Sequence, residues 1–175
     1  MIAYIRLTDT KRSQSATEAK IFRRYLSASK STKPGLNLAP FSPAPMKPLS
    51  ILVADDEEYI RLLIQQWLEA AGHHVACAAN GKEAAALLTL VQFDLAVTDI
   101  LMPESDGFDL IAELKKLQPA ARILAMSGGG RIVTGDDWLK LAQGLGAHAA
   151  ITKPFDQLQF MAGVKLALAP PRPSG

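Results

Sequence analysis

Four short apolar stretches of the sequence each end in side chains that can do chemistry. Asp55 and Asp56 follow the first stretch, and Asp99, Ser127 and Lys153 follow three later ones. Carboxylates brought close together repel one another and lose hydration, so a positive charge must lie beside them. A hard divalent cation suits this set because its ligands are oxygens with no His or Cys among them, and Lys153 adds a further charge.

The elements that must position these side chains are five strands alternating with five helices. Short apolar runs predict the strands, and apolar residues at spacings of three and four predict the helices. The predicted strands are 49–54, 74–78, 93–98, 122–126 and 149–152. The predicted helices are 57–71, 82–90, 106–117, a fourth capped by Thr134 with Trp138, Leu141, Ala142 and Leu145 on its apolar face, and 156–168.

This order predicts an α/β fold, a doubly wound five-stranded parallel sheet flanked by five helices, of the flavodoxin-like kind. Strands joined by crossover helices must be parallel, and helices on both faces explain why the strands are apolar throughout. Because the carboxyl ends of parallel strands meet at one edge of a sheet, the five side chains named above are predicted to converge there.

Each of these residues taken singly also has a structural explanation. Asp55 or Asp56 could cap the helix that follows, Ser127 could belong to a turn, and Lys153 could be a solvated surface residue. Asp99 is the exception, because the next predicted helix begins seven residues later, too far along the chain for Asp99 to cap it. The joint occurrence of these residues at four strand ends favours one site over separate caps and turns.

Charge separates the chain into a basic extension and a folded part. Its 175 residues, 49% of them apolar, suffice for about one domain. Residues 1–48 carry nine Lys and Arg against Asp9 and Glu18, a net charge of +7, and the rest carries ten against fifteen, a net charge of −5. The folded part, 49–169, is therefore mildly acidic and does not indicate a nucleic-acid partner.

The extension 1–48 and the tail 170–175 are predicted to lie outside the fold. Residues 27–48 are rich in Ser, Lys and Pro with no sustained apolar period, so they lack the surface that ordering requires. Three interpretations of the extension stay open: a disordered tail, a start codon placed too early with Met46 as the natural beginning, and a targeting peptide.

Other features exclude further classes. The single cysteine, Cys77, rules out an internal disulfide, and with three histidines it matches no common zinc pattern. The longest run without a charged residue has thirteen residues, whereas a transmembrane helix needs about 20 apolar residues. We therefore expect a cytoplasmic protein with no membrane segment.

The segments that carry these residues resemble the receiver domain of bacterial two-component response regulators. The matching segments are LVADDEE, TDILMPESDGFDL, LAMSG and GAHAAITKPF, in this order over about residues 49–169. The resemblance implies a stand-alone phosphorylation-dependent switch in which Asp99 accepts a phosphoryl group from a sensor histidine kinase or a histidine phosphotransfer protein. Such a protein is no enzyme beyond catalysing its own phosphotransfer and dephosphorylation.

The resemblance also implies Mg²⁺ as the cofactor. Asp56 and Asp99 would be direct ligands, Asp55 would act largely through water, and the backbone carbonyl of Leu101 would complete the protein ligands. Mg²⁺ would keep Asp99 ionised among its neighbours, so that this carboxylate can act as the nucleophile.

Two further residues are implied on the phosphoryl side of the site. Ser127 would hydrogen-bond a phosphoryl oxygen, Lys153 would pair with Asp99 or its phosphate, and the peptide bond from Lys153 to Pro154 would be cis. Phosphoryl transfer depends mainly on positioning and on stabilising charge on the phosphoryl oxygens, which a cation and an ammonium at this edge would provide.

The sequence departs from the resemblance at Ala150. Receiver domains usually carry an aromatic residue three positions before the lysine, and its inward swing carries the signal, which a methyl group cannot do. We therefore hypothesise that residues 128–135 and Trp138 carry the signal, with a core position for Trp138 as the alternative. A change in Trp138 fluorescence with an acyl-phosphate mimic would support the hypothesis.

Two other functional classes stay open. Ala150 favours a module that docks a partner regardless of phosphorylation. A phosphatase with an aspartyl nucleophile would need a second Asp two residues after Asp99, where Leu101 stands. No DNA-binding domain is expected after the last helix, so the output would be a contact with an unknown downstream protein.

Overall fold

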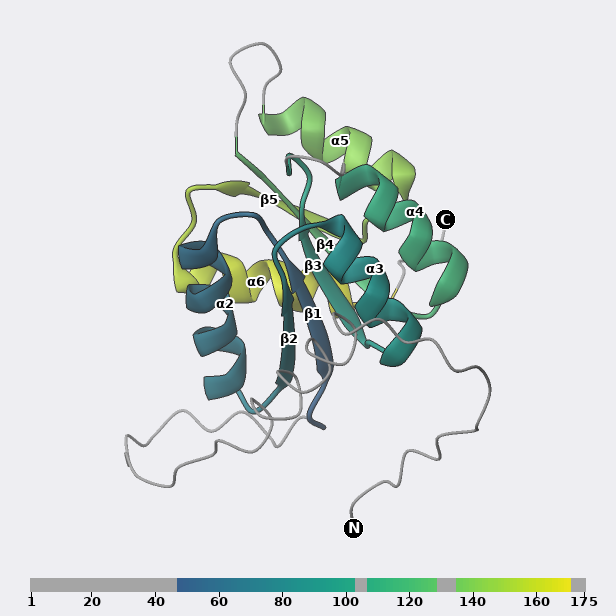
Figure 1. The fold of residues 1–175 in the computed structure, drawn as a ribbon. Coiled ribbons are helices and arrows are strands. Elements are labelled where there is room, and N and C mark those ends of the chain that lie inside the picture. The colour runs from purple at the N-terminus through teal and green to yellow at the C-terminus, as the bar shows by residue number, and fades with distance from the viewer. Residues whose placement is uncertain (1–46, 103–106, 129–134, 171–175) are drawn as a thin grey trace.

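The computed structural model describes residues 47–102, 107–128 and 135–170 (Figure 1). Several sequence predictions concern parts outside the described residues. These are the disorder of the extension through residue 46, the cap at Thr134, the signalling loop over 129–134, the side chain of Trp138, and the tail from residue 171.

The centre of the fold is one five-stranded parallel sheet. Its strands are β1 (Ser50–Ala54), β2 (His74–Ala78), β3 (Leu95–Asp99), β4 (Arg122–Gly128) and β5 (Ala149–Lys153). Their order across the sheet is β2-β1-β3-β4-β5, and every neighbouring pair is parallel. Because β1 lies between β2 and β3, the winding direction reverses at β1, which confirms the predicted doubly wound sheet.

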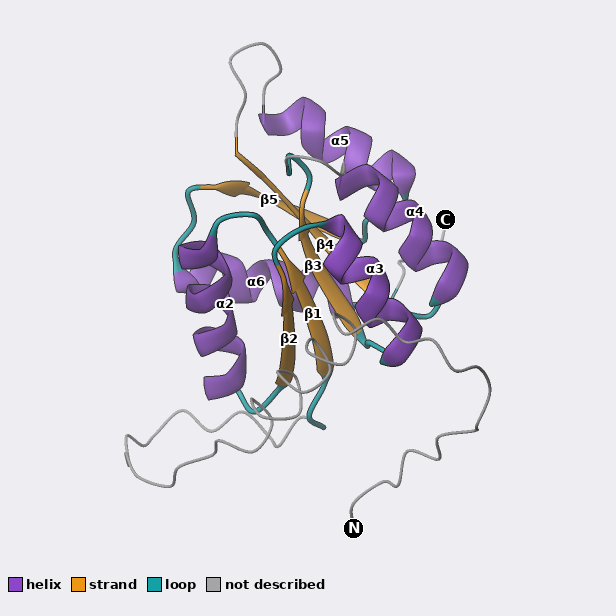
Figure 2. Cartoon of the chain, in the orientation of Figure 1, coloured by secondary structure: helices purple, strands orange, loops and turns teal. Residues whose placement is uncertain are grey.

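Helices cover both faces of this sheet (Figure 2). They are α2 (Glu58–Ala70), α3 (Gly81–Leu90), α4 (Gly107–Leu117), α5 (Gly135–Leu145) and α6 (Gln157–Leu168). One face packs against α2 and α6, through side chains that include Ile64 and Phe160. The other packs against α3, α4 and α5. Burial on both faces explains why the strand sequences are apolar without alternation.

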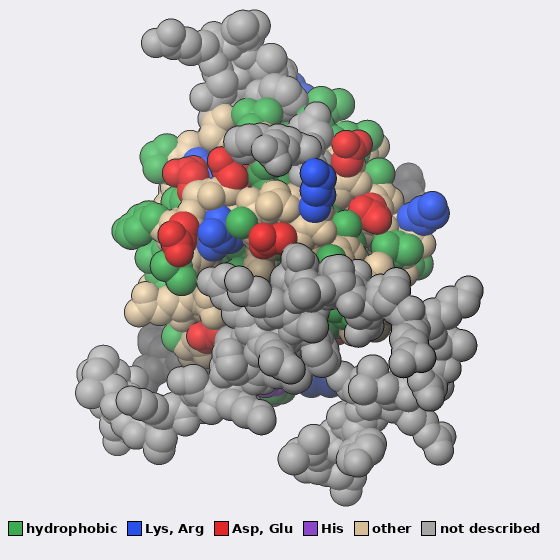
Figure 3. Space-filling view, in the orientation of Figure 1, with side chains coloured by type: hydrophobic (Ala, Val, Ile, Leu, Met, Phe, Trp, Pro, Cys, Tyr) green, Lys and Arg blue, Asp and Glu red, His purple; other side chains and the backbone are tan. Residues whose placement is uncertain are grey.

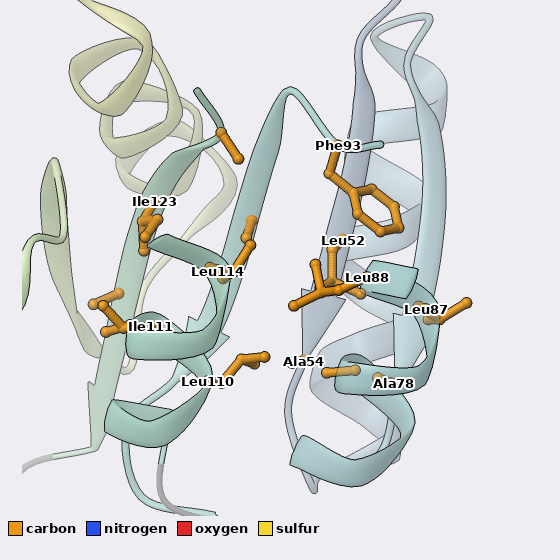
Figure 4. Packing of buried hydrophobic residues seen from close by; sticks show 14 of the residues in the cluster. Leu52, Ala54, Ala78, Leu87, Leu88, Phe93, Leu110, Ile111, Leu114 and Ile123 are labelled. Atoms are coloured by element: carbon orange, nitrogen blue, oxygen red, sulfur yellow. The ribbon is translucent and has the colours of Figure 1, made fainter. Parts of the chain in front are cut away.

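Aliphatic side chains fill the layer between the sheet and helices α3 and α4 (Figure 4). Leu87 and Leu88 of α3, Leu110 and Leu114 of α4, and Leu52 of β1 all belong to this layer, and each is buried. Burying a side chain of this size contributes about 1.5–3 kcal/mol. This packing fixes α3 and α4 on the sheet.

The start of β3 differs from its sequence prediction. The apolar run predicts a strand from residue 93, but β3 begins at Leu95. The backbone N–H of Phe93 donates to the side-chain oxygen of Gln118 at 2.8 Å, and the Asp94 carboxylate accepts from the N–H of Ser50 at 2.8 Å. These tertiary partners take the groups that a strand ladder would use, and local sequence does not reveal them.

Two observations concern the helices and the surface of the described residues. No helix among the described residues is long and apolar enough to cross a membrane. The face seen in Figure 3 carries acidic and basic side chains interspersed with apolar ones.

Candidate functional site

The strand register brings the predicted site residues to one edge of the sheet. β1 and β3 pair in step, so Asp55 after β1 lies level with Asp99 at the end of β3. On the other side of β3, Asp99 pairs with Met126, the residue before Ser127. Lys153 ends the adjacent strand β5. The sheet therefore gathers residues that lie almost a hundred positions apart in the sequence.

Lys153 joins the acidic side chains of the site. Its Nζ donates a hydrogen bond to Oδ2 of Asp99 at 2.7 Å, and it lies 2.7 Å from Oδ2 of Asp55 as an ion pair. The side chain of Lys153 is 11% exposed, and those of Asp55 and Asp99 are 0% and 6% exposed. Burial by itself would lower the pKa of Lys153, but the two aspartates outweigh it and hold that pKa above its ordinary value.

Asp55 is a fully buried carboxylate with few charges to balance it. Its Oδ1 accepts a hydrogen bond from the N–H of Glu57 at 2.9 Å, and its backbone carbonyl accepts one from Nη1 of Arg61 at 2.6 Å. Burial raises the pKa of the Asp55 carboxyl, and Lys153 and the Glu57 amide offset only part of that rise. A further cation beside Asp55 would therefore favour its ionised form.

Three carboxylates of this edge can share one cation. Asp55, Asp56 and Asp99 each offer one oxygen, and these oxygens lie within 4.8 Å of one another. The N-cap position of α2 is Glu57, so neither Asp55 nor Asp56 takes the capping position that was their structural alternative. An all-oxygen set with an exposed member, Asp56, fits a hard cation that keeps some of its water.

Asp99 is held on both sides of its carboxylate. Its Oδ1 accepts a hydrogen bond from the N–H of Leu101 at 3.0 Å, and its Oδ2 accepts the one from Lys153. A Cβ added at Gly107, the first residue of α4, would lie 2.0 Å from the backbone oxygen of Asp99. Only glycine therefore lets α4 approach the end of β3 this closely.

Ser127 contributes a buried hydroxyl to this edge of the sheet. Its side chain is fully buried, and its Oγ has no hydrogen-bond partner among the described residues. An unpaired buried hydroxyl costs about 1–3 kcal/mol, so such groups are usually satisfied. An oxygen-rich anion bound beside Asp99 would satisfy it.

Strand β5 and the peptide bond after it concern two further expectations. The peptide bond between Lys153 and Pro154 is cis, as the resemblance implied. Ala150 is partly buried and packs against the core on the α3–α4 side of the sheet. A methyl group in that place has no rotamer to change, so an aromatic swing at this position is absent from the protein.

Three residues of the site were not singled out from the sequence. Glu57 places Oε1 3.3 Å from Nζ of Lys153, Arg61 holds the carbonyl of Asp55, and Gly107 admits the end of β3. The position of Glu57 directly after the acidic pair was a signal that could have found it. Arg61 contacts the backbone of Asp55, and Gly107 lies against the backbone of Asp99. A pattern of residue types does not predict such contacts.

The comparisons with known proteins agree with this geometry. A family model of the response regulator receiver domain matches residues 51–165. The chain is 37% identical over 123 residues to the DNA-binding transcriptional regulator NtrC of Azospirillum brasilense, covering 70% of this chain and 25% of that protein. It is 34% identical over 106 residues to the chemotaxis protein CheY of Thermotoga maritima, covering 60% of this chain and 85% of that protein.

Solved structures show the same fold. A response regulator receiver domain protein of Clostridium thermocellum superimposes with a TM-score of 0.60 at 30% identity, covering 68% of this chain and 93% of that chain. NtrX of Brucella abortus superimposes with a TM-score of 0.63 at 31% identity, covering 70% of this chain and 27% of that chain. The chain therefore belongs to the response regulator receiver domain family, a family of signalling switches.

The matched region is only part of several relatives. The chain spans about a quarter of the length of the NtrC proteins that it matches. The match with those longer proteins therefore concerns their receiver domain alone.

Proposed function

We propose that this protein is a phosphorylation-dependent signalling switch in which Asp99 accepts a phosphoryl group. The donor is a histidine kinase or a histidine phosphotransfer protein, and the output is a contact with a downstream protein. The observation that carries this proposal is the cluster of Asp55, Asp56 and Asp99, in which Lys153 pairs with Asp55 and Asp99, together with the unpaired buried hydroxyl of Ser127. The cytoplasm is the proposed location of this reaction.

Asp99 is the nucleophile of the proposed reaction. One carboxylate oxygen of Asp99 forms a bond to phosphorus while the phosphorus–nitrogen bond of the donor phosphohistidine breaks, and the imidazole leaves with the electron pair. The Leu101 amide and the Lys153 ammonium hold the carboxylate in one orientation. Positioning of this kind supplies much of the rate gain in phosphoryl transfer.

The transferred group meets side chains that suit an anion. Lys153 is close enough to Asp99 to pair with phosphoryl oxygens on it, and the Ser127 hydroxyl can donate a hydrogen bond to one of them. Charge-assisted hydrogen bonds are roughly twice as strong as neutral ones. The new negative charge therefore attracts the Ser127 hydroxyl and the Lys153 ammonium. Their movement toward the phosphoryl group would make the site a switch.

Mg²⁺ is the proposed cofactor, and the residues present fit it. The carboxylates of Asp55, Asp56 and Asp99 and the backbone carbonyl of Leu101 would hold the ion. Burial raises the pKa of the Asp55 carboxyl, and a cation beside it would counter that rise. When bound, Mg²⁺ neutralises charge on the phosphoryl oxygens. The acyl phosphate that results on Asp99 is open to hydrolysis, so the signal is limited in time.

A second candidate function is a docking module that works without phosphorylation. The observation that favours it is Ala150, because the usual aromatic signal carrier is missing while the fold is intact. The two candidates differ in whether Asp99 is ever modified.

One labelling experiment separates the candidates. The protein is incubated with acetyl phosphate and Mg²⁺, as wild type and as Asp99→Asn, and the acyl-phosphate adduct is followed by mass spectrometry. The switch predicts an adduct on the wild type that the variant lacks. No adduct on either protein would favour the docking module, and rapid turnover of phosphate esters would indicate a hydrolase.

A further inference from the structure

Glu57 is a third carboxylate on Lys153, and it differs from the other two in exposure. Its Oε1 lies 3.3 Å from Nζ of Lys153, and its side chain is 61% exposed, against 0% for Asp55 and 6% for Asp99. Its carboxylate also lies outside the set of three whose oxygens are within 4.8 Å of one another. Glu57 therefore stands on the solvent side of the pocket, at the rim through which a donor must pass.

The side chain of Glu57 has no local structural task that would explain it. Glu57 is the N-cap residue of α2, a position that favours Ser, Thr, Asp or Asn because their short side chains accept from the first turn. The Glu57 side chain makes no such capping bond and extends to Lys153 instead. Its backbone does the anchoring, since its N–H donates to Asp55 and its carbonyl accepts from the N–H of Arg61.

The charge of Glu57 acts on anything that approaches Asp99. Phosphoryl donors are anions, and a like charge at the rim raises the energy of their encounter with the pocket. A small donor has no other contact with which to offset that repulsion. A protein donor presents its phosphoryl group within a large interface, whose contacts offset the cost of one rim charge.

We propose that Glu57 is a donor-specificity residue, which disfavours small dianionic phosphoryl donors and so reserves Asp99 for a protein donor. This inference rests on the proposed function, because it assumes that Asp99 is phosphorylated. With acetyl phosphate, a bond forms between an Asp99 oxygen and phosphorus, the bridging phosphorus–oxygen bond breaks, and acetate leaves with the electron pair. With phosphoramidate, the phosphorus–nitrogen bond breaks and ammonia leaves.

The test compares these two donors, because phosphoramidate carries one negative charge fewer than acetyl phosphate at neutral pH. Initial rates of adduct formation are measured at saturating Mg²⁺ and subsaturating donor for wild type, Glu57→Gln and the control Glu58→Gln. Glu58 is the exposed neighbour of Glu57, whereas the carboxylates that contact Lys153 within the described residues belong to Asp55, Glu57 and Asp99.

We expect Glu57→Gln to accelerate labelling by acetyl phosphate about threefold to tenfold at low salt, which corresponds to about 0.6–1.4 kcal/mol. The gain should shrink at high salt, because exposed charges are screened, and it should be smaller with phosphoramidate. Glu58→Gln should match the wild type. A purely structural role of Glu57 would instead change both donors alike at every salt concentration.

The outcomes separate the two proposals. An unchanged or slower rate of Glu57→Gln with acetyl phosphate, or an equal gain with both donors, would overturn the specificity role alone. Labelling of neither the wild type nor the variant by either donor would overturn the proposed function, and this inference with it.

Discussion

Gly107 offers a sharp test of how the fold positions the acceptor. A Cβ at this position would lie 2.0 Å from the backbone oxygen of Asp99, 2.7 Å from Cα of Ile100 and 2.9 Å from the carbonyl carbon of Asp99. All three atoms belong to the backbone, so no side-chain rotation can relieve the contact. Ordinary contacts begin at about 3.4 Å, so in Gly107→Ala the end of β3 and α4 must separate by more than about 1 Å.

The expected cost of Gly107→Ala falls on both stability and function. Overpacking of this kind costs typically about 1–3 kcal/mol, and a displacement of about 1 Å at reacting atoms can cost about 100-fold in rate. Chemical denaturation measures the first effect, and the rate of labelling by acetyl phosphate with Mg²⁺ measures the second. We expect both losses in Gly107→Ala.

Gly144→Ala is the matched control for this substitution. Gly144 lies in α5, and a Cβ there meets no atom within 4 Å. Because alanine is favoured over glycine inside a helix by about 1 kcal/mol, Gly144→Ala should keep or raise stability and leave labelling unchanged. If Gly107→Ala were as stable and as readily labelled as Gly144→Ala, the reasoning from close backbone approach would be refuted.

Two further predictions concern charge. Lys153→Met should lower the free energy of unfolding by about 3–5 kcal/mol at neutral pH, because it leaves the buried Asp55 unpaired, and urea denaturation should show a smaller loss in acid, where Asp55 is protonated. Lys165→Met is the control, because Lys165 is exposed. A loss of stability in Lys153→Met that is equal at all pH values would contradict the charge argument. His148 accepts a hydrogen bond from the N–H of Ile123 at 3.0 Å, and burial followed by the charges of its basic neighbours lowers its pKa. Its contribution to stability is therefore present above about pH 6.5 and is lost as the pH falls through the folded-state pKa, by about 1.36 kcal/mol per unit of pKa lowering. His148→Asn keeps an acceptor that does not titrate, so its thermal denaturation should depend less on pH between 7 and 5 than that of the wild type, and an unchanged dependence would count against this assignment.

The fold was largely predictable because its sequence signals are redundant. Apolar runs marked all five strands, and three of the five helices showed an apolar face, so the parallel order followed from the alternation of strands and helices. The start of β3 was not predictable, because Phe93 is apolar and its partner, Gln118, lies on another element. Local patterns carry no information on such a tertiary hydrogen bond.

The site was predictable where its chemistry sits at strand ends. Asp55, Asp99 and Lys153 converge because parallel strands bring their carboxyl ends together, and the structure places them within direct contact. The contact of Glu57 with Lys153 depends on which way a side chain leaves the start of α2. The role of Gly107 depends on the distance between the backbones of α4 and β3. The residue pattern predicts neither this distance nor the direction of the Glu57 side chain.

The location of the phosphoryl group is the most direct test of the central claim. After incubation with acetyl phosphate and Mg²⁺, borohydride reduction converts an aspartyl phosphate to homoserine, and peptide mass spectrometry locates the converted residue. We predict that conversion occurs at Asp99 and disappears when Mg²⁺ is chelated. Conversion at another carboxylate, or none at any position, would contradict the assignment of Asp99 as the phosphoryl acceptor.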